Sequence, residues 1–195
     1  PDRWHGPILR DPDVDDPMYY FDDVVYNKAA WMLHMLRRVV GDAVFFAALE
    51  SYAGDPRYRY ATARTEDFRA VCEALYGHSL NWFFDEWLIR DDRLQVRWEW
   101  SQSLLAGEIV LTLLVTQLQS TAYTMPIDCA IETTSGTTEE RIWIYSPADT
   151  FTFVLDRPAI DIRLDDGHWV LCDRIAGGAT AAEIPAPTAL RGAFP

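Results

Sequence analysis

Apolar residues recur with helical spacing in the first half of the chain. From Val25 to Val40 they return every three or four positions, and Gly41 follows where such a helix would end. The same spacing predicts a second helix ending at Gly54, a third over about 65–76 and a fourth over about 79–88. Thr65 and Ser79 are expected as N-caps of the last two helices. Residues 1–23, rich in Pro and Asp, are expected to be extended.

The hydrophobic period changes to two near residue 92. Alternation of apolar and polar residues over 94–100 predicts a half-buried strand. Further strands are expected at about 109–117, 125–133, 140–146, 150–155 and 159–164, and Asp166-Gly167 is expected to form a hairpin turn leading into Trp169 and Leu171. The predicted fold class is α+β in two blocks: helices over 1–92, a β-sandwich of about seven strands over 93–175, and a flexible tail over 176–195.

Composition narrows the function. With 30 Asp+Glu against 17 Lys+Arg, the net charge of −13 argues against a nucleic-acid partner, whose phosphates need basic side chains. The 8 Trp, 9 Tyr and 9 Phe exclude intrinsic disorder, because so many aromatic rings would not stay solvated. No apolar run approaches about 18 residues, so a membrane span is not expected.

The sequence contains no regular metal-binding motif. It contains neither His-Glu-x-x-His nor Cys-x-x-Cys, and its 4 His are far apart, so a self-contained zinc site is not expected. Asp11, Asp13, Asp15 and Asp16 lack the Gly and distal Glu of a regular calcium loop and are interpreted as a solvated acidic loop.

The three cysteines offer no clear nucleophile. Cys72 lies on an apolar helix face, where a buried and inert thiol is the expected state. Cys129 and Cys172 fall in the β block, and would pair only if neighbouring strands brought them together, which the sequence leaves open.

A short motif opens the first predicted helix, Tyr26-Asn-Lys-Ala-Ala30. Taken alone it would be structural, with Lys28 solvated and Tyr26 half buried. The motif is followed, in order, by Leu33-His34, Gly41-Asp42, Thr65-x-Asp67-Phe68, Phe84-x-x-Trp87 and the β block. This order resembles the M1 family of zinc aminopeptidases, in the second half of their thermolysin-like catalytic domain. The resemblance covers about residues 18–100, and the later strands are similar to the family's third domain.

The resemblance implies roles for two residues. Tyr26 matches the tyrosine of the family's Tyr-x-Lys-Gly-Ala motif, whose hydroxyl donates a hydrogen bond to the tetrahedral oxyanion formed during peptide hydrolysis. Lys28 matches the motif lysine and is interpreted as a structural partner for carboxylates. Ala29 stands where the family usually has Gly, and its methyl group is expected to restrict close backbone packing beside Tyr26.

The resemblance also implies a parent protein. The chain is interpreted as the C-terminal part of an M1-type zinc metallopeptidase that removes N-terminal residues from peptides. Zinc is expected in the intact parent, on a His-Glu-x-x-His helix and a later Glu upstream. This chain alone is expected to hold no metal and to be inactive. Its expected partners are peptide substrate and the missing N-terminal part of the same protein. An extracellular or periplasmic location is offered only as a guess.

Two other functions stay open. The first is a non-catalytic M1-like scaffold that binds a protein partner. The second is a standalone carbohydrate-binding module that would use the tryptophans, although Trp87, Trp98 and Trp100 fall on inward phases that core packing explains better. Substrate preference and oligomeric state are not predicted.

Overall fold

The computed structural model describes residues 6–179, and over that range it confirms the α+β fold. Two short turns of helix come first, a 3-10 helix at Pro17–Tyr20 and a π-helix at Val24–Lys28. The α-helices are α1 (Ala29–Val40), α2 (Asp42–Gly54), α3 (Thr65–Tyr76) and α4 (Asn81–Ile89). The sequence had predicted an extended segment before α1, and the 3-10 helix at Pro17–Tyr20 shows that this prediction is wrong in part.

The two predicted N-caps were each wrong by one residue. Thr65 is the first residue of α3 and Arg64 occupies the N-cap, because the Asp67 carboxylate reaches back and accepts the Arg64 N–H at 2.8 Å. Ser79 lies one residue before the N-cap of α4, and its hydroxyl accepts the N–H of Asn81 at 3.3 Å.

Seven strands follow within the described residues and form two sheets. They are β1 (Leu94–Leu105), β2 (Glu108–Gln117), β3 (Met125–Thr133), β4 (Gly136–Ile144), β5 (Ala148–Leu155), β6 (Ala159–Leu164) and β7 (Cys172–Ala179). One sheet has the order β5-β2-β1-β7 and the other β4-β3-β6. All neighbouring strands are antiparallel except β7, which runs parallel to β1.

The hairpin predicted after β6 is wrong. After β6 the backbone takes positive φ at Asp165 (51°) and His168 (53°) and crosses to the other sheet, so Trp169 and Leu171 lie in a connection and not on a hairpin strand. The Asp165 carboxylate holds this turn by accepting the N–H of Trp169 at 2.7 Å. Strand β7 extends to Ala179, into the range expected as a tail, and residues 180–195 lie outside the described residues.

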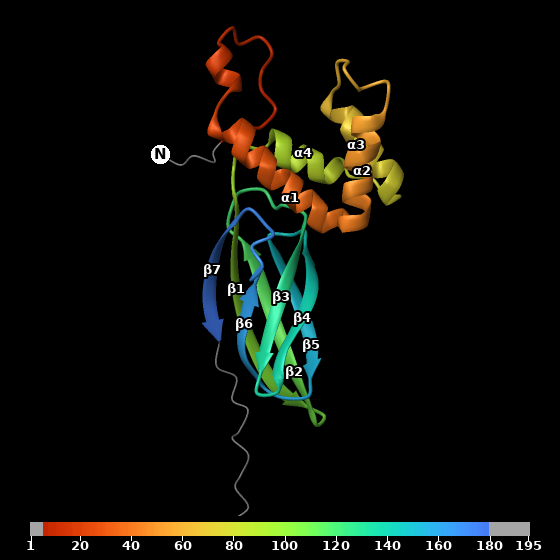
Figure 1. Ribbon diagram of the computed structural model, residues 1–195. Coiled ribbons are helices and arrows are strands. Elements are labelled where there is room, and N and C mark those ends of the chain that lie inside the picture. The colour runs from red at the N-terminus through yellow and green to blue at the C-terminus, as the bar shows by residue number, and fades with distance from the viewer. Residues whose placement is uncertain (1–5, 180–195) are drawn as a thin grey trace, which may run out of the picture.

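The helices cover one end of the sandwich, and α1 crosses above the strands (Figure 1). A single hydrophobic core continues from one part into the other. Helix α1 buries one face, formed by Met32, Met35, Leu36, Val39 and Val40. Because this stripe packs inward, the opposite face of α1 is left toward solvent. No helix among residues 6–179 is long and apolar enough to span a membrane.

Candidate functional site at the start of helix α1

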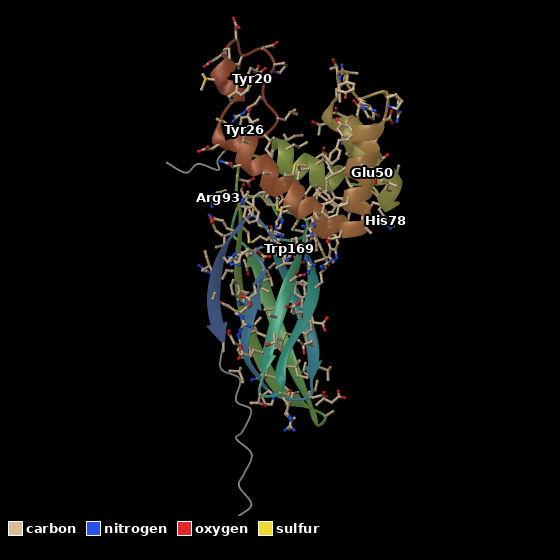
Figure 2. All side chains as sticks on the ribbon, viewed as in Figure 1. Tyr20, Tyr26, Glu50, His78, Arg93 and Trp169 are labelled. Atoms are coloured by element: carbon tan, nitrogen blue, oxygen red, sulfur yellow. The ribbon has the colours of Figure 1, made fainter. Side chains whose placement is uncertain are left out.

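Tyr26 projects from the π-helix that leads into α1. Its side chain is 58% exposed, and its ring lies 6.3 Å from that of Phe21, which is also exposed. Figure 2 shows Tyr26 at the N-terminal end of α1, away from the sandwich. Within residues 6–179 the hydroxyl has no hydrogen-bond partner, so its proton is free to be donated to a group outside the chain.

Asp22 fixes the beginning of this turn. Its carboxylate accepts the N–H of Val25 at 2.8 Å, and its carbonyl oxygen accepts the N–H of Tyr26 at 3.2 Å. The carboxylate also forms an ion pair with Arg10. Partial burial raises the pKa of Asp22. The hydrogen bond from Val25 and the Arg10 guanidinium together lower this pKa by more than burial raises it, so the net shift is downward. Asp22 is therefore held as an anion.

Lys28 fixes the end of the turn. Its side chain is only 2% exposed, and its Nζ donates to the carbonyl oxygens of Gly6 and Arg90, each at 2.9 Å. Burial lowers the pKa of Lys28, while the nearby charges of Asp92 and Asp91 oppose that shift. The hydrogen bonds that the sequence interpretation gave to carboxylates thus go to two backbone carbonyls. The structural interpretation of the motif is also reversed, because Lys28 is buried and Tyr26 is exposed.

Ala29 needs no special backbone conformation. It is the first residue of α1, with φ −66° and ψ −38°, and its side chain is half exposed. Any L-residue adopts this helical conformation. The methyl group that replaces the family's usual Gly is therefore accommodated without backbone strain.

The sequence interpretation missed a hollow beside α1. Ala30, Trp31 and His34 line a cavity of about 320 Å³ that begins one helical turn beyond Tyr26. Trp31 and His34 meet edge to face, with ring centroids 5.4 Å apart. One signal was available, since Trp31 is a large aromatic residue beside the buried stripe that starts at Met32. The hollow thus has an aromatic wall and lies on the helix that follows the Tyr26 turn.

The three cysteines carry no catalytic chemistry in this arrangement. Cys72 and Cys129 are buried, Cys172 is half buried, and all are free thiols. Cys129 lies on β3 and Cys172 on β7, which belong to different sheets, so the pairing left open by the sequence does not form.

Carboxylates of the acidic loop accept hydrogen bonds from the backbone of the same loop. Asp11 accepts the N–H of Asp13 at 3.0 Å, and Asp16 accepts that of Met18 at 2.9 Å. The Tyr20 hydroxyl donates to the carbonyl oxygen of Asp11 at 2.8 Å. These contacts make turns and leave no ring of carboxylates around a common point.

The described residues do not fit the zinc that the M1 resemblance implies. In the part of the chain from 6 to 179, no three His, Cys, Asp or Glu side chains come together as a ligand set. His34 stacks against Trp169, and His168 contacts Arg174 through Nδ1 at 2.6 Å. His5 lies outside the described residues.

The helical part of the chain is similar to known peptidases. Residues 7–87 match the model of the Peptidase family M1 domain. The M1 resemblance is confirmed. Aminopeptidase N of Streptomyces lividans is 31% identical over 83 residues, which cover 42% of this chain and 10% of that protein. Aminopeptidase M1-D of Oryza sativa subsp. japonica is 36% identical over 67 residues, covering 34% of this chain and 7% of that protein.

A solved structure shows the same fold over most of the chain. A crystal structure of Legionella pneumophila aminopeptidase A in complex with aspartic acid aligns with 89% of this chain and 20% of that one, at a TM-score of 0.73 and 14% identity. At this identity the likeness shows the fold alone, and with 89% of the chain covered it spans both the helices and the strands. The chain spans about a tenth or less of the length of the curated relatives above.

Proposed function

We propose that this chain forms the second half of the catalytic domain of an M1-type zinc aminopeptidase, over residues 1–92, together with the adjoining β-sandwich over 93–175. The family match over 7–87 and the aminopeptidases among the relatives support the assignment. The reaction is hydrolysis of a peptide bond at the N-terminus of a peptide substrate. The rest of the enzyme is the natural partner of the exposed face of α1.

Tyr26 is the group through which this chain acts on the substrate. The observation that carries the proposal is an exposed phenol on a turn whose two ends are fixed by Asp22 and Lys28. When water adds to a peptide carbonyl, the carbonyl oxygen becomes an oxyanion. A neutral phenol, with a pKa of about 10, donates a hydrogen bond to that oxygen more strongly than to the carbonyl of the ground state. The Tyr26 hydroxyl therefore favours the transition state.

The zinc of the family is assigned to the rest of the enzyme. No ligand set exists among residues 6–179, so no step of this proposal passes through the metal. The contribution of this chain is limited to a hydrogen-bond donor and the surface around it.

The test uses the longer polypeptide that carries both halves of the catalytic domain. Tyr26→Phe removes one hydroxyl and should lower kcat by about 100-fold or more, with KM nearly unchanged, because the hydrogen bond strengthens in the transition state. Tyr60→Phe is the matched control, since Tyr60 is 95% exposed and lies far along the chain.

Two results would contradict the proposal. An unchanged kcat in Tyr26→Phe would remove Tyr26 from the reaction. A wild-type polypeptide that releases no amino acid from aminoacyl-arylamide substrates, yet binds another protein, would instead favour the non-catalytic scaffold.

A further inference from the structure

Three distant segments meet at the ammonium group of Lys28. The strap at residues 6–10 lies beside the end of α4, where Leu9 N–H donates to the Leu88 carbonyl at 2.9 Å. Lys28 Nζ bonds one carbonyl on each of these segments, at Gly6 and Arg90. The third segment is the π-helix of Lys28 itself. One buried side chain therefore joins the turn that carries Tyr26 to two pieces of the chain.

We infer that Lys28 is a positioning residue for Tyr26, holding the π-helix in the register that presents the phenol. The inference rests on the proposed function of Tyr26. Residues two apart on a helix point to nearly opposite sides, and here one side chain is 2% and the other 58% exposed. The spacing of the motif thus places the anchor inside the protein and the donor outside it.

The π-helix is the feature whose register Lys28 would maintain. A π-turn contains one residue more than the α-helical turn, and isolated π-turns are rare and are often found at functional sites. If Val24–Lys28 relaxed into α register, the chain before the turn would rotate about the helix axis by up to about 100°, the angle per residue of an α-helix, and Tyr26 would rotate by part of that angle. The Asp22 carboxylate restrains the first residues of the turn, and Lys28 restrains the last.

The anchor point is itself rigid. Arg90 is the C-cap of α4, and its guanidinium donates to the Ala122 carbonyl at 2.9 Å and pairs with Asp92 at 2.6 Å. A cation at the C-terminus of a helix is favoured by the helix dipole, so the Lys28 ammonium suits the Arg90 carbonyl. A methionine in its place would fill the space but leave two buried carbonyls without this donor.

The first test follows the Tyr26 ring in the chain itself. 3-Fluorotyrosine is incorporated at position 26, and its fluorine NMR signal is recorded in wild type, Lys28→Met and Lys28→Gln. One narrow signal is expected for wild type, and a shifted, broadened or divided signal for both variants. Lys28→Gln keeps an N–H donor and provides the measurement if Lys28→Met fails to fold.

A matched control separates position from stability. Val39→Ala shortens a buried side chain on the inner face of α1 and lowers stability without touching the turn. Its fluorine signal should stay narrow and unshifted. The inference is overturned if both Lys28 variants keep the wild-type signal, or if Val39→Ala changes that signal as much as they do.

The kinetic test uses the longer polypeptide. Lys28→Gln should lower kcat about tenfold with little change in KM, and should have no further effect when Tyr26 is already Phe, because both substitutions then remove the same interaction. Additive losses would contradict a positioning role. If Tyr26→Phe alone has no effect, the proposed function fails, while the fluorine signals still report whether Lys28 places the ring.

Discussion

The indole ring of Trp169 stacks on the imidazole of His34, with centroids 4.5 Å apart and planes 4° from parallel. His34 belongs to α1, and Trp169 to the connection between β6 and β7. The Arg38 guanidinium lies 4.9 Å from the same indole ring. Figure 2 places Trp169 where the helices meet the sandwich. This ring therefore couples the helix that carries the candidate site to the β domain.

Removal of the Trp169 ring should destabilise the contact between α1 and the sandwich. Trp169→Ala is expected to lower the free energy of unfolding by about 2 kcal/mol, below the usual cost for a fully buried Trp, because the side chain is only half buried. Urea denaturation followed by circular dichroism measures the change. Tyr60→Ala, at a 95% exposed ring, should stay within about 0.5 kcal/mol of wild type. Equal stabilities of the two variants would show that the stack contributes nothing.

An ion pair forms a second link between the helices and the sandwich. Arg38 of α1 donates through Nε to Asp128 of β3 at 3.0 Å, and Arg141 of β4 reaches the same carboxylate at 3.1 Å. The side chains of Arg38 and Asp128 are 30% and 18% exposed, so solvent screens the pair in part.

A double-mutant cycle measures this pair. Arg38→Ala and Asp128→Ala are expected to show a coupling free energy of about 1 kcal/mol, smaller in high salt. The pair Arg141 and Asp128 serves as the comparison within one sheet. A coupling of zero in low salt would assign Arg38 to packing on Trp169 alone.

Periodicity predicted the elements well, for reasons visible in the structure. From Met32 to Val40, the predicted apolar stripe is the face of α1 that packs on the core, and the alternation from Leu94 to Trp100 is a strand with one buried side. Both patterns follow from burial on one face, which local sequence records. The last strand was placed too early, at Trp169 and Leu171, because Cys172–Ala179 contains small residues and two glycines and pairs with β1, which lies far earlier in the chain.

The candidate site was predictable only in part. The motif singled out Tyr26 and Lys28 as candidates, but nothing in the sequence indicates that Lys28 lies against carbonyls 22 and 62 residues away. Burial of a charged group depends on distant segments that supply its partners. The hollow beside Trp31 was missed for the same reason, since its shape depends on what α1 leaves uncovered.

The purified chain should bind no stoichiometric zinc. The expectation follows from the separation of the potential ligands over residues 6–179 and from the absence of His-Glu-x-x-His in the sequence. The chain is purified without a metal-affinity tag, incubated with excess zinc, desalted and analysed by atomic emission. One tightly held zinc per chain would contradict the assignment of the metal to another part of the enzyme. Incubation with a chelator should likewise leave the melting temperature unchanged.

The buried thiols predict a loss of stability at alkaline pH. Burial raises the pKa of Cys72 to about 11 and those of Cys129 and Cys172 to about 12, from an ordinary value of 9.0. The unfolded chain therefore releases these protons first. The stabilisation from each thiol is complete below about pH 9 and is lost as the pH rises toward the pKa of the folded state, by at most about 1.4 kcal/mol per pH unit and thiol.

Cys129→Ala isolates one thiol from this loss. Its free energy of unfolding should be lower than that of wild type at pH 8, because a buried sulfur is removed, but should fall less steeply between about pH 9 and pH 11. Urea denaturation in the presence of a reductant measures both slopes. Lys28, whose pKa is lowered, contributes with the opposite sign, but equally in the two proteins, so the difference in slope belongs to Cys129. Parallel curves would show that the Cys129 thiol ionises at the same pH in the folded and unfolded chains.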